Sequence, residues 1–237
     1  MRFFIESSAL ATQTLTGEDA KHLKDVLRVK VGEQVVLCDE TGMDHHCVVT
    51  TLGKSAVGYD ILSSVPNVNE PNTQITLYQG LPKSPKMELI IQKAVEIGIT
   101  DIVLVETQRS IVKVKDEGKK IDRWQKIAKS AAMQSQRGRI PQVRYAKWTE
   151  AMAEANNHQL ALMAYEKEET TTLKQALTEV TVPETVAIYI GPEGGFTPEE
   201  VGQATQKTVV PISLGRRILR TETAALVMAS QILYELM

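Results

Sequence analysis

From Thr73 onward, short apolar runs alternate with segments of helical periodicity, and this alternation constrains the fold more than any other feature. The apolar runs are nearly continuous, as expected for strands buried on both faces of a parallel sheet. Strands that alternate with helices predict an α/β domain with such a sheet. The expected strands are Ile75–Leu81, Ile102–Glu106, Leu160–Ala164, Val186–Ile190 and Val209–Leu214. The expected helices are Pro85–Ile97, Lys119–Gln136, Thr149–Ala155, Leu173–Glu179, Pro198–Thr205 and Thr223–Met237.

The first 72 residues have a different pattern, in which short β-type runs surround turns rich in Gly and Asp. Such runs, with one short helix, predict a small barrel. The expected strands are Met1–Ile5, Val35–Cys38, His46–Thr51 and Val57–Leu62, and the expected helix is Lys21–Leu27. The polar stretch Asn67–Asn72 has no periodicity and is the expected linker. We therefore expect two domains, residues 1–72 and 73–237.

Two unusual loops follow the last two expected strands, Gly191–Gly195 and Gly215–Arg220. Ligands of open parallel sheets bind outside the carboxyl ends of the strands, and glycines let the backbone approach a ligand closely. The two loops therefore predict a ligand site at this edge. Under the alternative interpretation, the first loop is only a tight connection to a helix that Thr197, Pro198 and Glu200 begin with a capping box.

Positive charge is concentrated in one segment, although the net charge of the chain is only −2. Residues 109–147 hold 12 Lys and Arg against 3 Asp and Glu. This concentration predicts a polyanionic partner, and the alternative is a solvated helix face. Trp124, Gln134, Arg137 and Arg139 in this segment are residue types suited to stacking on bases and contacting phosphates.

The cysteines and histidines of the chain argue against a metal site and against a nucleophilic catalytic set. Cys38, His45, His46 and Cys47 lack the spacing of a metal site, so we expect no metal. No Ser-His-Asp or Cys-His set is evident in the sequence. Two cysteines, no signal segment and no apolar run near the ~18 residues of a membrane span lead us to expect a cytoplasmic protein.

Several of these motifs occur together, in order, in one known family. IGPEGGF at Ile190–Phe196 and LGRRILRTETA at Leu214–Ala224 resemble the RsmE family of small-subunit ribosomal RNA uridine-N3 methyltransferases, which belong to the SPOUT class. The same family pattern fits further positions along nearly the whole chain, namely His22 with Leu27 and Arg28, Gln92–Gly98, Arg109 with Ser110, Arg123 with Trp124, and Ala132–Arg137.

The resemblance implies a PUA-like β-barrel RNA-binding domain over 1–72 and a SPOUT methyltransferase domain with a trefoil knot over 73–237. It implies S-adenosyl-L-methionine as methyl donor without a metal, 16S ribosomal RNA of the small subunit as substrate, a homodimer and no membrane. The residues expected to bind the donor are Ala164, Ile190, Gly191, Pro192, Gly195, Leu214, Gly215, Ile218, Leu219 and Thr223. The residues expected to bind RNA are His22, Arg28, Arg109, Arg123, Gln134 and Arg137.

The chemistry of the implied reaction indicates which residues to consider as catalytic. Uridine N3 becomes a nucleophile only after losing its proton, and a guanidinium beside the base stabilises the resulting anion. We expect Arg220 in this role, with Glu193 or Glu222 orienting it or accepting the proton. The alternatives are a structural Arg220–glutamate pair and a hydrolase that uses the two glutamates. A SPOUT enzyme acting on another RNA or another position, or a non-enzymatic RNA-binding protein, also remains open.

Overall fold

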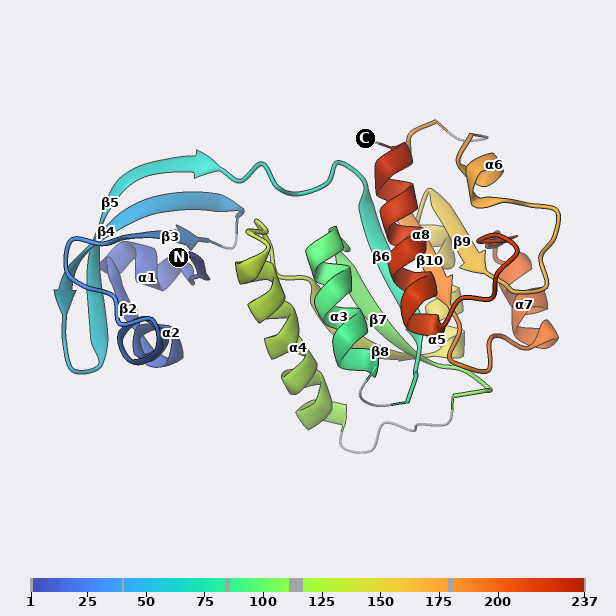
Figure 1. The fold of residues 1–237 in the computed structure, drawn as a ribbon, viewed down its shortest axis with the longest axis horizontal. Coiled ribbons are helices and arrows are strands. Elements are labelled where there is room, and N and C mark those ends of the chain that lie inside the picture. Colours follow the sequence, from blue (N-terminus) through green and yellow to red (C-terminus); the bar gives the residue numbers. More distant parts are fainter. Residues whose placement is uncertain (1, 40, 84–85, 111–116, 179–180, 237) are drawn as a thin grey trace. The chain divides into compact units, whose positions relative to one another are not determined.

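The computed structural model describes residues 2–39, 41–83, 86–110, 117–178 and 181–236. The chain forms two compact units (Figure 1). The first unit comprises Met1–Glu70 and Ala132–Ile140, and the second comprises Pro71–Ala131 and Pro141–Met237. The sequence did not predict that residues 132–140 pack with the N-terminal unit.

The first unit is built on one curled five-stranded sheet of mixed direction in the order β1-β3-β4-β5-β2. β1 runs parallel to β3 and the other pairs are antiparallel. The strands are β1 (Arg2–Phe4), β2 (Thr14–Thr16), β3 (Gln34–Cys38), β4 (Met43–Leu52) and β5 (Ala56–Pro66). The helices are α1 (Ser7–Thr12) and α2 (Gly17–Lys21), which continues as a π-helical turn over His22–Val26. The expected barrel is thus an open half-barrel, because β1 and β2 lie at the edges of the sheet.

Arg137 lies inside the first unit, which corrects the expectation that its side chain contacts RNA. It is 2% exposed, and its Nε and Nη2 donate to Glu70 at 2.9 and 2.7 Å. The Arg137 carbonyl accepts hydrogen bonds from the Arg2 guanidinium, and Asn67 and Asn69 both donate to the Gln136 carbonyl. The expected linker is therefore partly a packed segment, and a buried, paired guanidinium is not available to a phosphate.

The second unit contains a six-stranded, all-parallel sheet in the order β11-β9-β10-β6-β7-β8. Its strands are β6 (Gln74–Gly80), β7 (Asp101–Glu106), β8 (Gln142–Lys147), β9 (Leu160–Ala164), β10 (Thr185–Ile190) and β11 (Val210–Ile212). The five expected strands are confirmed. β8 was missed because an edge strand buries only part of its side chains, here Val143 and Ala146, and does not read as an apolar run.

Helices cover both faces of this sheet. They are α3 (Lys86–Ile97), α4 (Glu117–Gln134), α5 (Trp148–Ala153), α6 (Leu173–Thr178), α7 (Pro198–Thr205) and α8 (Thr221–Glu235). α3 and α8 pack side by side on one face (Figure 1). α5 and α7 pack on the other, against a core that includes the stacked rings of Tyr78 and Tyr189. Pro85, Glu179 and Met237, which the sequence assigned to helices, lie outside the described residues.

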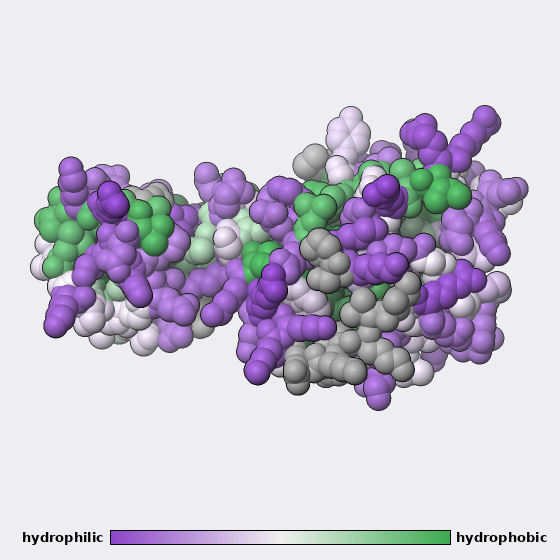
Figure 2. All heavy atoms as spheres, turned by 60° about the horizontal axis from the view of Figure 1, so that its bottom comes forward, coloured by the Kyte–Doolittle hydropathy of each residue, from purple (hydrophilic) through white to green (hydrophobic). Residues whose placement is uncertain are grey.

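The surface carries both hydrophilic and hydrophobic residues (Figure 2). In the view of Figure 2, hydrophilic residues cover most of each unit and hydrophobic residues form separate patches. α8 buries Ala225, Met228 and Ile232 but leaves Tyr234 76% exposed. Among the described residues, we find no helix with the length and apolar character needed to span a bilayer.

Candidate active site

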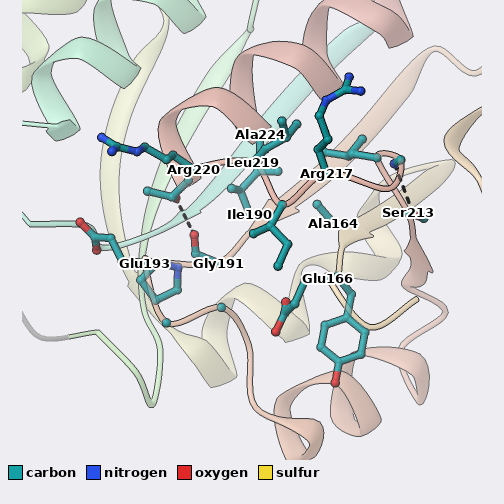
Figure 3. Close-up of a pocket in the computed structure, with 18 of the residues that line it drawn as sticks. Ala164, Glu166, Ile190, Gly191, Glu193, Ser213, Arg217, Leu219, Arg220 and Ala224 are labelled. Atoms are coloured by element: carbon teal, nitrogen blue, oxygen red, sulfur yellow. Dashed lines mark hydrogen bonds between the residues drawn. The ribbon is translucent and has the colours of Figure 1, made fainter. Parts of the chain in front are cut away.

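A pocket of about 470 Å³ lies at the carboxyl ends of β9, β10 and β11 in the second unit (Figure 3). Its volume falls in the range of roughly 300–1,000 Å³ that small-molecule sites occupy. The pocket is lined by three loops and the start of α8, through Lys86, Ala164, Tyr165, Glu166, Ile190–Gly195, Ser213–Thr221 and Ala224. The ligand site expected from the two loops is therefore present as a cavity.

The glycine loop, Gly191–Gly195, is shaped by its own close packing. A Cβ on Gly191 would lie 2.9 Å from the Gly195 Cα, so only glycine fits there. Gly195 has φ +65°, which favours glycine, and its backbone faces the Glu166 carboxylate. The expected capping box of α7 follows, with Thr197 Oγ1 accepting from the Glu200 N–H at 3.2 Å. The loop is thus a compact, preformed wall of the pocket.

Hydrogen bonds join the glycine loop to the first turn of α8. The Thr221 hydroxyl donates to the Gly191 carbonyl at 2.6 Å, and Gln79 Nε2 donates to the same hydroxyl at 2.8 Å. Gln79 is fully buried on β6. On the outer side of the loop, Arg109 Nη1 donates to the carbonyls of Gly194 and Phe196 at 2.6 and 3.2 Å. The loop is therefore held from both sides.

A three-residue charge cluster lies at the mouth of the pocket. Lys86 Nζ is 3.2 Å from Glu193 Oε1 and 3.3 Å from Glu222 Oε2. Glu193 also accepts from the Lys83 N–H at 3.1 Å. Burial raises the pKa of Glu193, but hydrogen bonds from the backbone N–H groups of Glu193 and Lys83 and the nearby Lys86 outweigh it and lower that pKa overall. Glu193 is therefore ionised at neutral pH and forms an ion pair with Lys86.

Arg220 is the N-cap residue of α8 and is exposed at the rim of the pocket. It extends toward the same side of the pocket mouth as Glu193 in Figure 3, whereas Arg217 extends away from the cavity. Within the described parts of the chain, the two glutamates form ion pairs with Lys86, and no ion pair joins either of them to Arg220. The structural pair that the sequence offered as an alternative is thus not formed.

The structure brings together every residue expected to bind the donor except Thr223. α8 begins at Thr221, so Thr221 faces the pocket while Thr223 is exposed. Leu214 and Leu219 are half-buried, and Ile218 lines the cavity while remaining 85% exposed. Glu222 does not line the cavity itself and reaches it only through Lys86.

Several residues that line the pocket were not among the expected site residues, and Lys86, Tyr165, Glu166 and Thr221 are four of them. Tyr165 and Glu166 directly follow a strand that the sequence did predict, so their position could have been found. Lys86 is distant in sequence from both special loops, and no signal pointed to it.

The residues expected to bind RNA come from both units. His22, Arg28, Arg109, Arg123 and Gln134 are exposed. Arg123 Nη2 lies 2.6 Å from Glu88 Oε1. Trp124, a candidate for base stacking, is only 9% exposed because it packs on the inner side of α4.

The first unit brings together Asp39, His45 and Ser64, a set that the sequence did not reveal. His45 Nε2 is 3.2 Å from Asp39 Oδ2, and His45 Nδ1 is 2.8 Å from Ser64 Oγ. Asp39 Oδ1 also accepts from the backbone N–H groups of Thr41 and Met43, so the set stabilises a turn. Among the described residues, no group of three or more potential ligands that could hold a metal ion is found.

Comparison with known proteins agrees with this arrangement. Two family models match, an RNA methyltransferase domain over residues 69–233 and an RNA methyltransferase PUA domain over residues 15–57. The chain is 32% identical over 246 residues to the ribosomal RNA small subunit methyltransferase E of Bacillus subtilis, covering 99% of this chain and 96% of that protein. A crystal structure of the Neisseria gonorrhoeae methyltransferase E bound to S-adenosyl methionine matches with 30% identity and a TM-score of 0.86, covering 99% of this chain and 97% of that one.

A putative methyltransferase from Legionella pneumophila, solved with S-adenosylmethionine, matches with 30% identity and a TM-score of 0.87, covering 99% and 97% of the two chains. The pairing of these two domains, with a pocket at the strand ends, defines an RNA methyltransferase. The chain belongs to the ribosomal RNA small subunit methyltransferase E family. The expected PUA-like and SPOUT-class folds are confirmed, and the trefoil knot stays a prediction.

Proposed function

We propose that this protein binds S-adenosyl-L-methionine in the pocket and methylates N3 of a uridine in 16S ribosomal RNA of the small subunit. The observation that carries the proposal is the preformed pocket at the strand ends with Arg220 at its rim. Related enzymes of the family are named for small-subunit ribosomal RNA, and two similar structures hold S-adenosylmethionine.

The pocket residues fit this donor. Ala164, Ile190, Leu214 and Leu219 supply apolar walls for an adenine ring, and the loop backbones supply N–H and C=O groups for its edge. At Gly215 an added Cβ would meet nothing within 4 Å, which leaves open space beside the backbone for a ligand. The Glu166 carboxylate lies in the wall and suits hydroxyl or cationic groups of a ligand. No metal is part of the proposal.

The donor supplies a methyl group made electrophilic by its sulfonium charge. The protein must then align the uridine base and stabilise the anion formed when N3 loses its proton. The Arg220 guanidinium is our candidate for stabilising the negative charge on the carbonyl oxygens that flank N3. Glu222 and Glu193 remain candidates for accepting the proton. Arg109 holds the glycine loop from outside, so we assign it a positioning role in addition to the expected RNA contact.

The RNA-binding surface is proposed from exposed basic and polar side chains. His22 and Arg28 of the first unit, and Arg123 and Gln134 on α4, are candidates for phosphate or base contacts. We further propose a homodimer formed through α8, whose Tyr234 side chain is largely exposed. The two cysteines are free and buried, in keeping with a reducing cytoplasm.

The decisive experiment is to map the methylated nucleotide. Purified protein and labelled donor are incubated with small subunits and with free 16S RNA, and the product is digested and analysed by mass spectrometry. We expect one 3-methyluridine, absent without the donor. A methyl group on another base, atom or RNA supports the alternative of a related enzyme with a different target. No transfer to either substrate despite tight RNA binding contradicts the enzymatic assignment.

A further inference from the structure

We propose that Lys86 is a positioning residue for methyl transfer, because it occupies the carboxylates of Glu193 and Glu222 and so keeps Arg220 available to the substrate. This inference rests on the proposed function, since it assumes that the Arg220 guanidinium acts on the uridine anion. Lys86 is the first residue of α3 and is far in sequence from the loops Gly191–Gly195 and Gly215–Arg220.

The geometry places one cation between two anions from different segments. Lys86 Nζ lies 3.2 Å from a Glu193 oxygen on the glycine loop and 3.3 Å from a Glu222 oxygen in the first turn of α8. The side chains of all three residues are partly buried, with 28%, 27% and 15% of their surface exposed. Partial burial weakens the solvent screening of these charges. The contact with Glu222 is an ion pair only, because Glu222 Oε2 makes no hydrogen bond with the described residues.

Arg220 is close in sequence to Glu222 and lies on the same side of the pocket mouth as Glu193 (Figure 3). It precedes Glu222 by two residues, and it extends with Glu193 toward one side of the pocket mouth (Figure 3). A guanidinium is the better partner for a carboxylate, because its planar fork binds both oxygens at once. Arg220 would therefore compete for Glu193 and Glu222 if the ammonium of Lys86 were absent.

Loss of the Lys86 side chain should leave the frame of the pocket intact. The Gln79–Thr221–Gly191 hydrogen bonds hold the glycine loop to α8 independently of Lys86. The Lys83 N–H still donates to Glu193 from the backbone. In the variant we therefore expect Arg220 to form an ion pair with Glu193 or Glu222, the pair that the sequence offered as an alternative. The variant should still fold and bind the donor.

The test is a set of single-turnover rates at saturating donor and RNA, with donor affinity measured by calorimetry. We expect Lys86→Met to lower the rate by an amount approaching the ~10²–10³-fold loss of one anion-stabilising donor, while donor affinity changes less than about threefold. Lys86→Arg should recover most of the rate, because it retains the charge. The matched control is Lys93→Met on the same helix, where Lys93 pairs with the single carboxylate of Glu96 at 2.8 Å, and its rate should stay within about twofold.

The double variant Lys86→Met/Arg220→Ala separates the possible causes. If Lys86 acts through Arg220, the double variant should be no slower than Arg220→Ala alone. Multiplicative losses, or a Lys86→Met protein that loses donor affinity as much as rate, would overturn the inference. A normal rate in Arg220→Ala would instead overturn the catalytic role of Arg220 in the proposed function, whatever Lys86→Met does.

Discussion

Glu70→Gln should destabilise the first unit strongly, because it removes a carboxylate that forms an ion pair with a buried arginine. Glu70 Oε1 accepts from Arg137 Nε at 2.9 Å and from the Gly138 N–H at 2.8 Å, and Oε2 accepts from Arg137 Nη2 at 2.7 Å. Glutamine keeps the size but loses the charge, and its amide nitrogen opposes one of these donors. Arg137, at 2% exposure, would then lose the charged acceptor of two of its hydrogen bonds.

The expected magnitude follows from burial. Breaking a buried pair by removing one partner costs about 3–5 kcal/mol. Because 28% of the Glu70 side chain is exposed, water partly compensates, and we expect about 2–4 kcal/mol. For a cooperative unit of this size, each kcal/mol shifts the melting temperature by roughly 4–8 °C, so a fall of about 10 °C or more is expected.

The effect should depend on pH with a definite sign. Burial raises the pKa of Glu70, but the Arg137 hydrogen bond and charge, with the N–H groups of Gly138 and Arg139, lower it overall. The folded pKa then lies below the unfolded one, so the stabilisation is present above the unfolded pKa and is lost as pH falls through the folded pKa. The difference between wild type and Glu70→Gln should therefore shrink in acid.

The two units need not unfold in one step, so the stability of the first unit must be measured locally. The assay is therefore hydrogen exchange, measured by mass spectrometry on peptides from β1–β5. Calorimetric melting of the same samples gives the temperature shift. The control is Arg123→Gln, which breaks a shorter contact of 2.6 Å at a side chain that is 69% exposed, and it should cost less than about 1 kcal/mol. If Glu70→Gln is no more destabilising than this control, the argument from burial is refuted.

Three further outcomes are expected at the proposed site. Arg220→Ala should fold and bind the donor but lose about 10²–10³-fold in single-turnover rate, and a near-normal rate would contradict its role. Gly215→Val should abolish calorimetric donor binding, since the glycine has φ +107° and an added side chain would enter the open space of the pocket. Neutralising His22 and Arg28 together should weaken RNA binding and reduce its salt slope by about one per lost phosphate contact, without changing donor affinity. An unchanged slope would place these two side chains outside the RNA contact.

The strands and the position of the pocket were predictable because their signals are local. Continuous apolar runs identified five strands of the parallel sheet, and the loops after β10 and β11 indicated the ligand edge. α1 and β2 were missed because they span only 6 and 3 residues, which is too short for a helix or strand periodicity to be recognised. The π-helical turn at His22–Val26 also has no sequence signature that we recognise.

The errors at the site came from long-range pairing, which periodicity does not report. From their residue types and their place in the basic segment, Arg137 and Trp124 were both expected to contact RNA. Both side chains are buried in the structure. The partner of Arg137 is 67 residues away, and the cation that binds Glu193 and Glu222 comes from the start of α3. Sequence identified the arginine expected to act, but not the lysine that keeps the neighbouring carboxylates occupied.

The discontinuous first unit sets an order of events during synthesis on the ribosome. Its N-terminal strands emerge early, but Arg2 and Cys38 find their carbonyl partners only on Arg137 and Gly138. About 60 further residues must be made in between, which takes roughly 3–12 s at ordinary elongation rates. Throughout that interval the nascent half-barrel lacks the segment that completes it, and a fragment ending at residue 70 would remain in that incomplete condition permanently.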